Sequence, residues 1–206
     1  MRHHIVRLFA IVGMLVCPTV CPESSASMPS TDVATFAGGC FWCMEGPFDL
    51  IDGVLETTVG YTGGTARNPT YEQVSSGTTG HAEAIQVTYD SAKVTYEKLL
   101  EVFWRNIDPT TPNQQFADHG SQYRTAIFYH TEEQHRLASA SKQQLEASGK
   151  FHQPLVTEIV PAGPFYPAED YHQDYYKKNA TRYQLYKMGS GRAGFLKKTW
   201  GPSTNH

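Results

Sequence analysis

The stretch Gly38-Gly39-Cys40-Phe41-Trp42-Cys43-Met44-Glu45 decides how this chain folds around its chemistry. The two glycines permit a tight turn after a predicted strand, Asp32 to Ala37, and a short predicted helix follows as far as about Leu50. Cys40 would then lie at a helix N-terminus, where unpaired N–H groups and the helix dipole favour its thiolate form. The segment therefore predicts a reactive thiol at a strand-to-helix turn.

A second thiol, Cys43, follows one helical turn after Cys40. Residues three apart on a helix are neighbours, so the two sulfurs can form a disulfide after a small adjustment of the backbone. Such a bond closes a very short loop and constrains the unfolded chain little, which favours a chemical role over a structural one. Two ordinary buried cysteines remain the alternative, because free cysteines are common in protein cores.

The composition is that of a compact protein without affinity for nucleic acid. The chain has 206 residues, 40% of them hydrophobic, which suffices for one domain with its own core or at most two small ones. The formal net charge is -3, and the lysines and arginines are scattered along the chain. No broad basic surface is therefore expected.

The N-terminus has the composition of a secretion signal. A charged front precedes an uncharged apolar run, Leu8 to Val16, which is shorter than the roughly 20 residues that a membrane-spanning helix needs. Small residues follow, and their pattern predicts cleavage after Ser27. We therefore expect a signal peptide at 1–27, export to a bacterial periplasm, and a single catalytic domain at 28–206.

Cleavage after Ser27 would leave Cys40 and Cys43 as the remaining cysteines. An exported chain with one such close pair does not use a disulfide framework for its stability, which again favours chemistry. A retained membrane anchor is one alternative. A lipid attached at Cys17 or Cys21 is another, although a valine precedes each of these cysteines where a lipoprotein site needs a small residue.

A candidate acid lies in the segment from Ala82 to Tyr89, which alternates as a strand does. The period of two places Glu83 on the same face as Ile85 and Val87. A carboxyl group on an inward-facing apolar stripe stays protonated unless it is well hydrogen-bonded, and it can then act as a general acid near neutral pH. A glutamate at a strand end that reaches solvent is the alternative.

The remaining segments alternate between strands and helices. Predicted strands are Val54–Thr62, Tyr123–His130 and Leu155–Val160, and predicted helices are Thr95–Ile107, Thr131–Ser148 and Ala168–Gln184. Some neighbouring strands are joined without a helix, so we expect an α+β domain with a mixed sheet. Residues 65–80 read as a long loop, and the chain from about Met188 reads as an extended tail that wraps the surface.

Five short motifs occur in order along the chain. They are Gly39-Cys40-Phe41-Trp42, Gly60-Tyr61-Thr62-Gly63-Gly64, Thr79-Gly80-His81-Ala82-Glu83-Ala84, Gln122-Tyr123-Arg124-Thr125 and Tyr166-Pro167-Ala168-Glu169-Asp170-Tyr171-His172. Together they resemble the A-type peptide methionine sulfoxide reductases, over a span from about Phe36 to Tyr176. The resemblance implies a two-layer α/β plait with a ferredoxin-like core, followed by a long irregular C-terminal segment.

The resemblance also implies the reaction and the residues that perform it. The substrate would be the S epimer of methionine sulfoxide, free or in oxidised proteins, and no metal or organic cofactor would be required. Cys40 would be the nucleophile and Glu83 the acid. Substrate binding would fall to an aromatic pair and three polar residues: Phe41, Trp42, Tyr71, Asp118 and Tyr123.

Recycling of the enzyme is where this chain departs from many members of the family. Those members use cysteines near the C-terminus, whereas no cysteine follows Cys43 here. Members with a Gly-Cys-Phe-Trp-Cys motif are similar to this chain, and in them the nearby cysteine resolves the intermediate. The resemblance therefore implies a Cys40–Cys43 disulfide that a thioredoxin-like dithiol reduces, in a monomer.

Two other functions compete with this one. A general thiol–disulfide oxidoreductase also carries Cys-x-x-Cys at a helix start, although Phe41 and Trp42 would crowd a protein disulfide. A zinc module would need two more ligands, and only His130 and His135 come near a suitable spacing. We expect structural roles for His172 and Asp170, with assistance to the site as the alternative.

Overall fold

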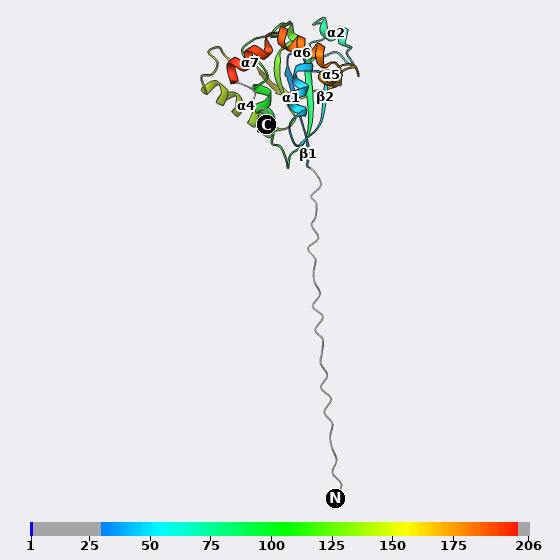
Figure 1. Ribbon diagram of the computed structural model, residues 1–206, viewed down its shortest axis with the longest axis vertical. Helices are drawn as coiled ribbons and strands as arrows, with labels where there is room; N and C mark the ends of the chain where they lie inside the picture. Colours follow the sequence, from blue (N-terminus) through cyan, green and yellow to red (C-terminus); the bar gives the residue numbers. More distant parts are fainter. Residues whose placement is uncertain (2–29, 202–206) are drawn as a thin grey trace.

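The computed structural model describes residue 1 and residues 30–201 (Figure 1). The predicted signal peptide, with Cys17 and Cys21, lies outside the described residues. Within the described part, no helix combines the length and the apolar character needed to cross a membrane.

Strands and helices interleave along the chain. The strands are β1 (Thr31–Gly38), β2 (Val54–Thr62), β3 (Ala82–Asp90), β4 (Gln114–Gln115), β5 (Asp118–His119), β6 (Thr125–Tyr129), β7 (Glu158–Pro161) and β8 (Tyr166–Pro167). The helices are α1 (Trp42–Asp49), α2 (Tyr71–Ser75), α3 (Tyr96–Trp104), α4 (Glu132–Ala147), α5 (Tyr175–Lys178), α6 (Ala180–Gly189) and α7 (Arg192–Trp200), with a 3-10 turn η1 at Ser121–Tyr123.

Six of the strands form one sheet in the order β7-β6-β1-β3-β2-β8. The central strand β1 is antiparallel to β3 and β6, whereas β6 and β7 run parallel. The prediction of an α+β domain with a mixed sheet is therefore confirmed. Because β1 and β3 are neighbours, the turn after β1 and the start of β3 meet at one end of the sheet.

The main core lies between one face of the sheet and the helices α1, α3 and α4. Phe36 of β1 is fully buried at its centre, and its ring stacks on those of Phe48 in α1 and Phe103 in α3, with centroid distances of 5.3 and 5.2 Å. Ile85 and Val87 of β3 belong to the same cluster. The alternation of β3 thus directs Glu83 towards the helix-covered face, as the period of two predicted.

The turn between β1 and α1 needs glycine at Gly39. Its φ of +80° lies in the left-handed region, and a Cβ there would come within 2.4 Å of the Gln115 side chain. The helix begins slightly later than predicted, because Phe41 is the N-cap and Trp42 the first helical residue. Cys40 therefore lies just before the helix, in the turn itself.

The C-terminal prediction needs correction. The chain from about Met188 was expected to be extended, but it completes α6 and then forms α7. Gly191, with φ of +84°, makes the turn between the two helices. Contacts with the rest of the domain stabilise α7, because its glycine and charged residues would not hold a helix alone. Phe195 packs edge-on against Phe116 with a centroid distance of 5.5 Å, and Arg192 is buried.

We predict that Phe36→Ala lowers the free energy of unfolding by about 3–5 kcal/mol, because it opens a cavity between three stacked rings. Urea denaturation followed by circular dichroism measures the change. The control Leu185→Ala removes a leucine that is 63% exposed, and it should cost less than about 0.5 kcal/mol. Equal costs for the two substitutions would contradict this account of the core.

Candidate active site

The predicted nucleophile and the predicted acid lie in the same pocket, at the end of the sheet where β1 and β3 are neighbours. The backbone N–H of Phe41 donates a hydrogen bond of 3.1 Å to Oε2 of Glu83. This bond joins the start of α1 to β3 and faces the carboxyl group towards the turn that carries Cys40. Both side chains are almost excluded from solvent, with exposed fractions of 6% for Cys40 and 2% for Glu83.

The pocket is a small cavity of about 70 Å³ to which six segments of the chain contribute. Its lining residues are Cys40, Phe41, Trp42, Tyr71, Glu83, Asp118, Tyr123 and Tyr186. Every site residue predicted from the sequence except Cys43 is among them. Cys43 lies behind Cys40, 1% exposed, in a cluster with Tyr175 and Tyr183.

Glu83 has the electrostatics of a neutral acid. The pKa of its carboxyl group is raised to about 8, chiefly by burial and also by the nearby Asp118, while the Phe41 N–H opposes part of the rise. The group is therefore mostly protonated at pH 7. It can donate a proton to an oxygen that enters the pocket, which the solvent-exposed alternative could not do as readily.

The sequence predicted that Cys40 is a thiolate, but its pKa in the structure favours the thiol. Burial raises the pKa of Cys40 well above its usual value, and the hydrogen bond with Cys43 and the nearby Glu83 raise it further. The same sulfur–sulfur hydrogen bond lowers the pKa of Cys43. Desolvation therefore dominates at Cys40, and the thiol keeps its proton in this structure.

Phe41 and Trp42 form an aromatic side of the pocket, and residues outside the pocket hold these rings in place. Trp42 stacks on Tyr175 with a centroid distance of 3.8 Å, and its Nε1 donates a hydrogen bond of 3.0 Å to Nδ1 of His172. Phe41 lies against the same imidazole at 5.0 Å. Because Nδ1 accepts this bond, the neutral imidazole carries its proton on Nε2. His172 is therefore a structural support, as expected.

The remaining histidines of interest are also structural. His81 accepts a hydrogen bond from the Gly64 N–H at Nδ1, and its Nε2 lies 2.7 Å from the Ala66 carbonyl oxygen. His130 bonds to Thr35, and His135 stacks on Tyr129. In residues 30–201, no three side chains of the types that ligate metals come together as a possible site.

Tyr71 and Tyr123 place phenolic hydroxyls at the pocket. Burial raises the pKa of Tyr71 to about 12 and that of Tyr123 further, so both keep their protons and can donate hydrogen bonds. Tyr71 opens α2, a helix in the stretch that was predicted to be a loop. The signal for that helix was present, because Thr70 and Gln73 form a capping box.

Two contributing residues were not predicted. The Tyr186 hydroxyl lines the pocket from α6 and donates a short hydrogen bond to Oδ2 of Asp118. Glu169 accepts hydrogen bonds from the Tyr71 N–H at 2.9 Å and from the Tyr61 hydroxyl at 2.8 Å, and so fixes α2 against the sheet. Glu169 lies in the fifth motif, whereas no sequence signal indicated Tyr186.

A larger hollow lies outside this pocket, along the outer edge of β2. Its volume is about 760 Å³, and it is lined by residues such as Leu50, Glu56, Asp170 and Lys177. Neither cysteine reaches it, and its carboxylates are solvated or tied in surface ion pairs such as Asp49–Lys177. Size alone does not make it the reactive site. Asp170 therefore lies outside the cysteine pocket, in agreement with a structural role.

Comparisons with known proteins agree with this geometry. A family model described as peptide methionine sulfoxide reductase matches residues 32–204. The chain is 58% identical over 170 residues to the peptide methionine sulfoxide reductase MsrA of Bacillus licheniformis, covering 82% of this chain and 94% of the relative.

Solved structures are similar as well. Mxr1 from Saccharomyces cerevisiae in reduced form superposes with a TM-score of 0.69 at 34% identity, over 73% of this chain and 86% of that one. Mxr1 in complex with Trx2 has a TM-score of 0.51 at 26% identity, over 70% of this chain and 84% of that one.

We predict that Glu83 makes the protein less stable as the pH rises from about 4 to 8. Its folded pKa, about 8, lies above its unfolded value near 4.3, so its contribution is complete at low pH and is lost as the pH approaches 8. Glu83→Gln should remove this loss, and its stability relative to wild type should rise by roughly 1 kcal/mol per pH unit in that window.

Urea denaturation at several pH values measures this difference. The exposed Glu146→Gln serves as the matched control and should give a curve parallel to wild type. A Glu83→Gln curve that is also parallel to wild type would show that the carboxyl group is not held neutral.

Proposed function

This chain belongs to the peptide methionine sulfoxide reductase family, and we propose that it reduces the S epimer of methionine sulfoxide through Cys40 and Glu83. One observation carries the assignment: a nucleophilic sulfur and a neutral carboxylic acid line the same small, aromatic-walled pocket. Family membership also favours this function over a general disulfide oxidoreductase or a zinc module.

Binding would sort the groups of the sulfoxide by polarity. The methyl group would lie against Phe41 and Trp42, whose rings offer no charge and are fixed by His172 and Tyr175. The oxygen would lie among the protonated Glu83 and the hydroxyls of Tyr71 and Tyr123. Donors that already face the oxygen stabilise the charge that grows on it during the reaction.

The first chemical step would oxidise Cys40 by two electrons and reduce the sulfoxide by two. The Cys40 thiol donates its hydrogen bond to Cys43, whose pKa is lowered to about 7, so that Cys43 in its thiolate form is the nearby acceptor for the Cys40 proton. The resulting Cys40 thiolate attacks the sulfoxide sulfur. Glu83 donates a proton to the oxygen as the S=O bond breaks. This leaves the Cys40 sulfur bonded to the methionine sulfur, and the released hydroxide attacks the Cys40 sulfur. The bond between the two sulfurs breaks, methionine leaves with that electron pair, and Cys40 becomes a sulfenic acid.

Cys43 would then resolve the intermediate. It attacks the Cys40 sulfenic acid, water leaves, and a Cys40–Cys43 disulfide forms. The Cys43 N–H already donates a 3.0 Å hydrogen bond to the Cys40 carbonyl, so the two residues share one tight turn. A thioredoxin-like dithiol would reduce the disulfide, in line with the complex between the related Mxr1 and Trx2.

The cellular location of the enzyme would be the bacterial periplasm. The charged and apolar N-terminal segment supports export and cleavage after Ser27, and the first strand begins later, at Thr31. A periplasmic location would follow from that export. Action as a monomer on free or protein-bound methionine sulfoxide completes the proposal.

We predict that Cys43→Ser supports one turnover with the S epimer and then stops. The variant keeps Cys40 and Glu83 but has no thiol to form the disulfide, so the sulfenic acid should accumulate. Mass spectrometry after one equivalent of each epimer should show one added oxygen on Cys40 with the S epimer and unmodified protein with the R epimer. Cys40→Ser is the inactive control, and normal cycling of Cys43→Ser with thioredoxin would contradict the resolving role.

We predict that Glu83→Gln lowers kcat by about 10²–10⁴-fold and leaves KM nearly unchanged, because it removes the proton donor but keeps the shape of the pocket. Steady-state kinetics with a methionine sulfoxide peptide measures both constants. The surface variant Glu146→Gln should match wild type. A fall in affinity with an unchanged kcat would instead assign Glu83 to substrate binding.

A further inference from the structure

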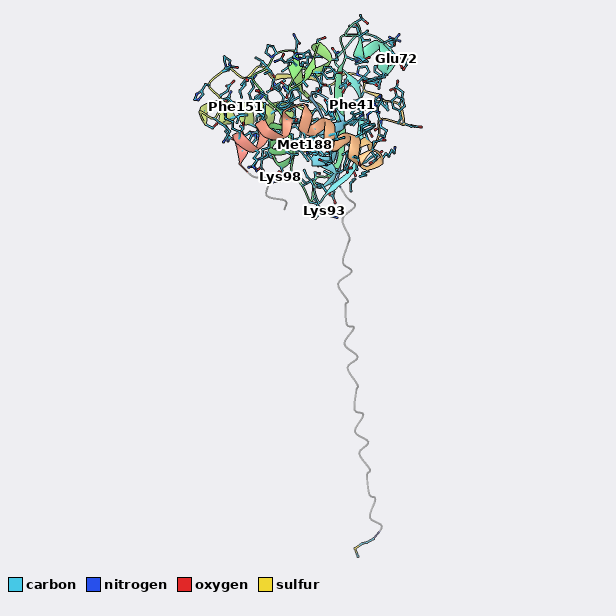
Figure 2. The ribbon with its side chains drawn as sticks, turned by 45° about the horizontal axis from the view of Figure 1, so that its top comes forward. Phe41, Glu72, Lys93, Lys98, Phe151 and Met188 are labelled. Carbon is cyan, nitrogen blue, oxygen red and sulfur yellow. The ribbon has the colours of Figure 1, made fainter. Side chains whose placement is uncertain are left out.

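A single arginine of α7 is buried beneath the active-site turn. Arg192 is only 2% exposed, and it is one of the largest fully buried side chains in the described structure. Figure 2 shows α6, drawn in orange and carrying the labelled Met188, across the front of the domain, and α7 follows directly after it. The C-terminal helices therefore insert a full positive charge into the interior.

The contacts of this guanidinium are with neutral groups. Nη2 donates a hydrogen bond of 2.9 Å to the Gly38 carbonyl, and Nη1 donates one of 2.6 Å to the Asn106 carbonyl. Nη1 also lies 3.7 Å from Sδ of Met44, and the Phe116 ring covers the group at 4.7 Å. The arginines that pair with carboxylates in residues 30–201 are Arg105, Arg124 and Arg136, and Arg192 is not one of them.

A buried charge without a counter-ion is costly, so this arrangement needs an explanation. The acidic groups that feel the charge lie at or beside the site. Arg192 helps to lower the pKa of Cys43 and opposes the rise in the pKa of Asp118. It also opposes the rise in the pKa of Tyr183, which packs with Cys43. An anion on the thiol pair would thus supply the missing partner during turnover. The guanidinium therefore lies where it favours a negative charge on the thiol pair.

The same side chain also fixes the turn that presents Cys40. Gly38 ends β1 and Asn106 follows α3, so the two hydrogen bonds join the sheet to a helix directly below the nucleophile. A Cβ on Gly39 would come within 3.0 Å of Nη2, which shows how closely the guanidinium packs on the turn.

We propose that Arg192 is a positioning residue for the nucleophile, which holds the Gly38–Cys40 turn in place and supplies the positive charge that the Cys40–Cys43 pair requires when it ionises. This proposal rests on the proposed function only in taking Cys40 as the attacking thiol. It adds the C-terminal helix α7 to the machinery of the site. Arg192 itself does not touch the substrate, since it does not line the pocket.

Other charged groups face the thiol pair and set the background for this effect. Glu83 and Asp118 disfavour the thiolate of Cys40, whereas Lys187 of α6 favours that of Cys43. Lys187 is only partly buried, so solvent and salt screen its charge more than that of Arg192. Loss of Arg192 should therefore have the larger effect.

The pH dependence of thiol ionisation in the reduced full-length protein tests the proposal. Arg192→Gln removes the charge and shortens the side chain, and Arg192→Lys keeps the charge. The exposed Arg182→Gln of α6 is the matched control. Iodoacetamide alkylation mapped to Cys40 and Cys43 by mass spectrometry, together with the ultraviolet absorbance of the thiolate, gives the midpoint of the pair without any sulfoxide.

We expect Arg192→Gln to raise the midpoint of the Cys40–Cys43 pair by about one pH unit and to slow alkylation of the pair at neutral pH by about tenfold. Arg192→Lys should recover most of the wild-type midpoint, and Arg182→Gln should leave it unchanged. An unchanged midpoint in a folded Arg192→Gln protein would overturn the proposal. Failure of both Arg192 variants to fold would assign the residue to folding alone and would also overturn it.

These outcomes are separate from the test of the proposed function. Alkylation requires neither sulfoxide reduction nor disulfide formation. An enzyme that fails to oxidise Cys40 with the S epimer can still show the Arg192 effect, and the converse also holds.

Discussion

The hydrogen bond from the Phe41 N–H to Glu83 is the contact on which the site depends, because it joins the two elements that carry the chemistry. Phe41 is the N-cap of α1, and Glu83 is near the start of β3. Their meeting follows from the sheet order, in which β1 and β3 are neighbours and α1 follows β1 directly. Without that pairing, the thiol and the acid would have no common pocket.

Burial of this pocket raises the pKa of both groups, with opposite consequences for the reaction. It keeps Glu83 protonated near neutral pH, which suits a proton donor, and it also keeps the proton on Cys40, which does not suit a nucleophile. The hydrogen bond to Cys43 gives that proton a nearby acceptor. In the proposed reaction, Cys43 would therefore act both before and after the sulfenic acid forms.

The C-terminal helices α6 and α7 also contribute residues at and beneath the site. Tyr186 of α6 lines the pocket and binds Asp118, and Arg192 of α7 lies beneath the turn that presents Cys40. This chain has no cysteine after Cys43. Its C-terminal helices contact the site through Tyr186 and Arg192.

The sequence by itself determined the α+β class, the strand-to-helix position of Cys40 and the inward direction of Glu83, because hydrophobic periodicity and turn glycines are local signals. The family resemblance added Asp118 and the tyrosines. Only the tertiary structure decided that α7 is helical, that Tyr186 and Arg192 reach the site, and that burial raises the Cys40 pKa. These features depend on contacts between residues far apart in the chain and on desolvation, which neither local spacing nor composition records.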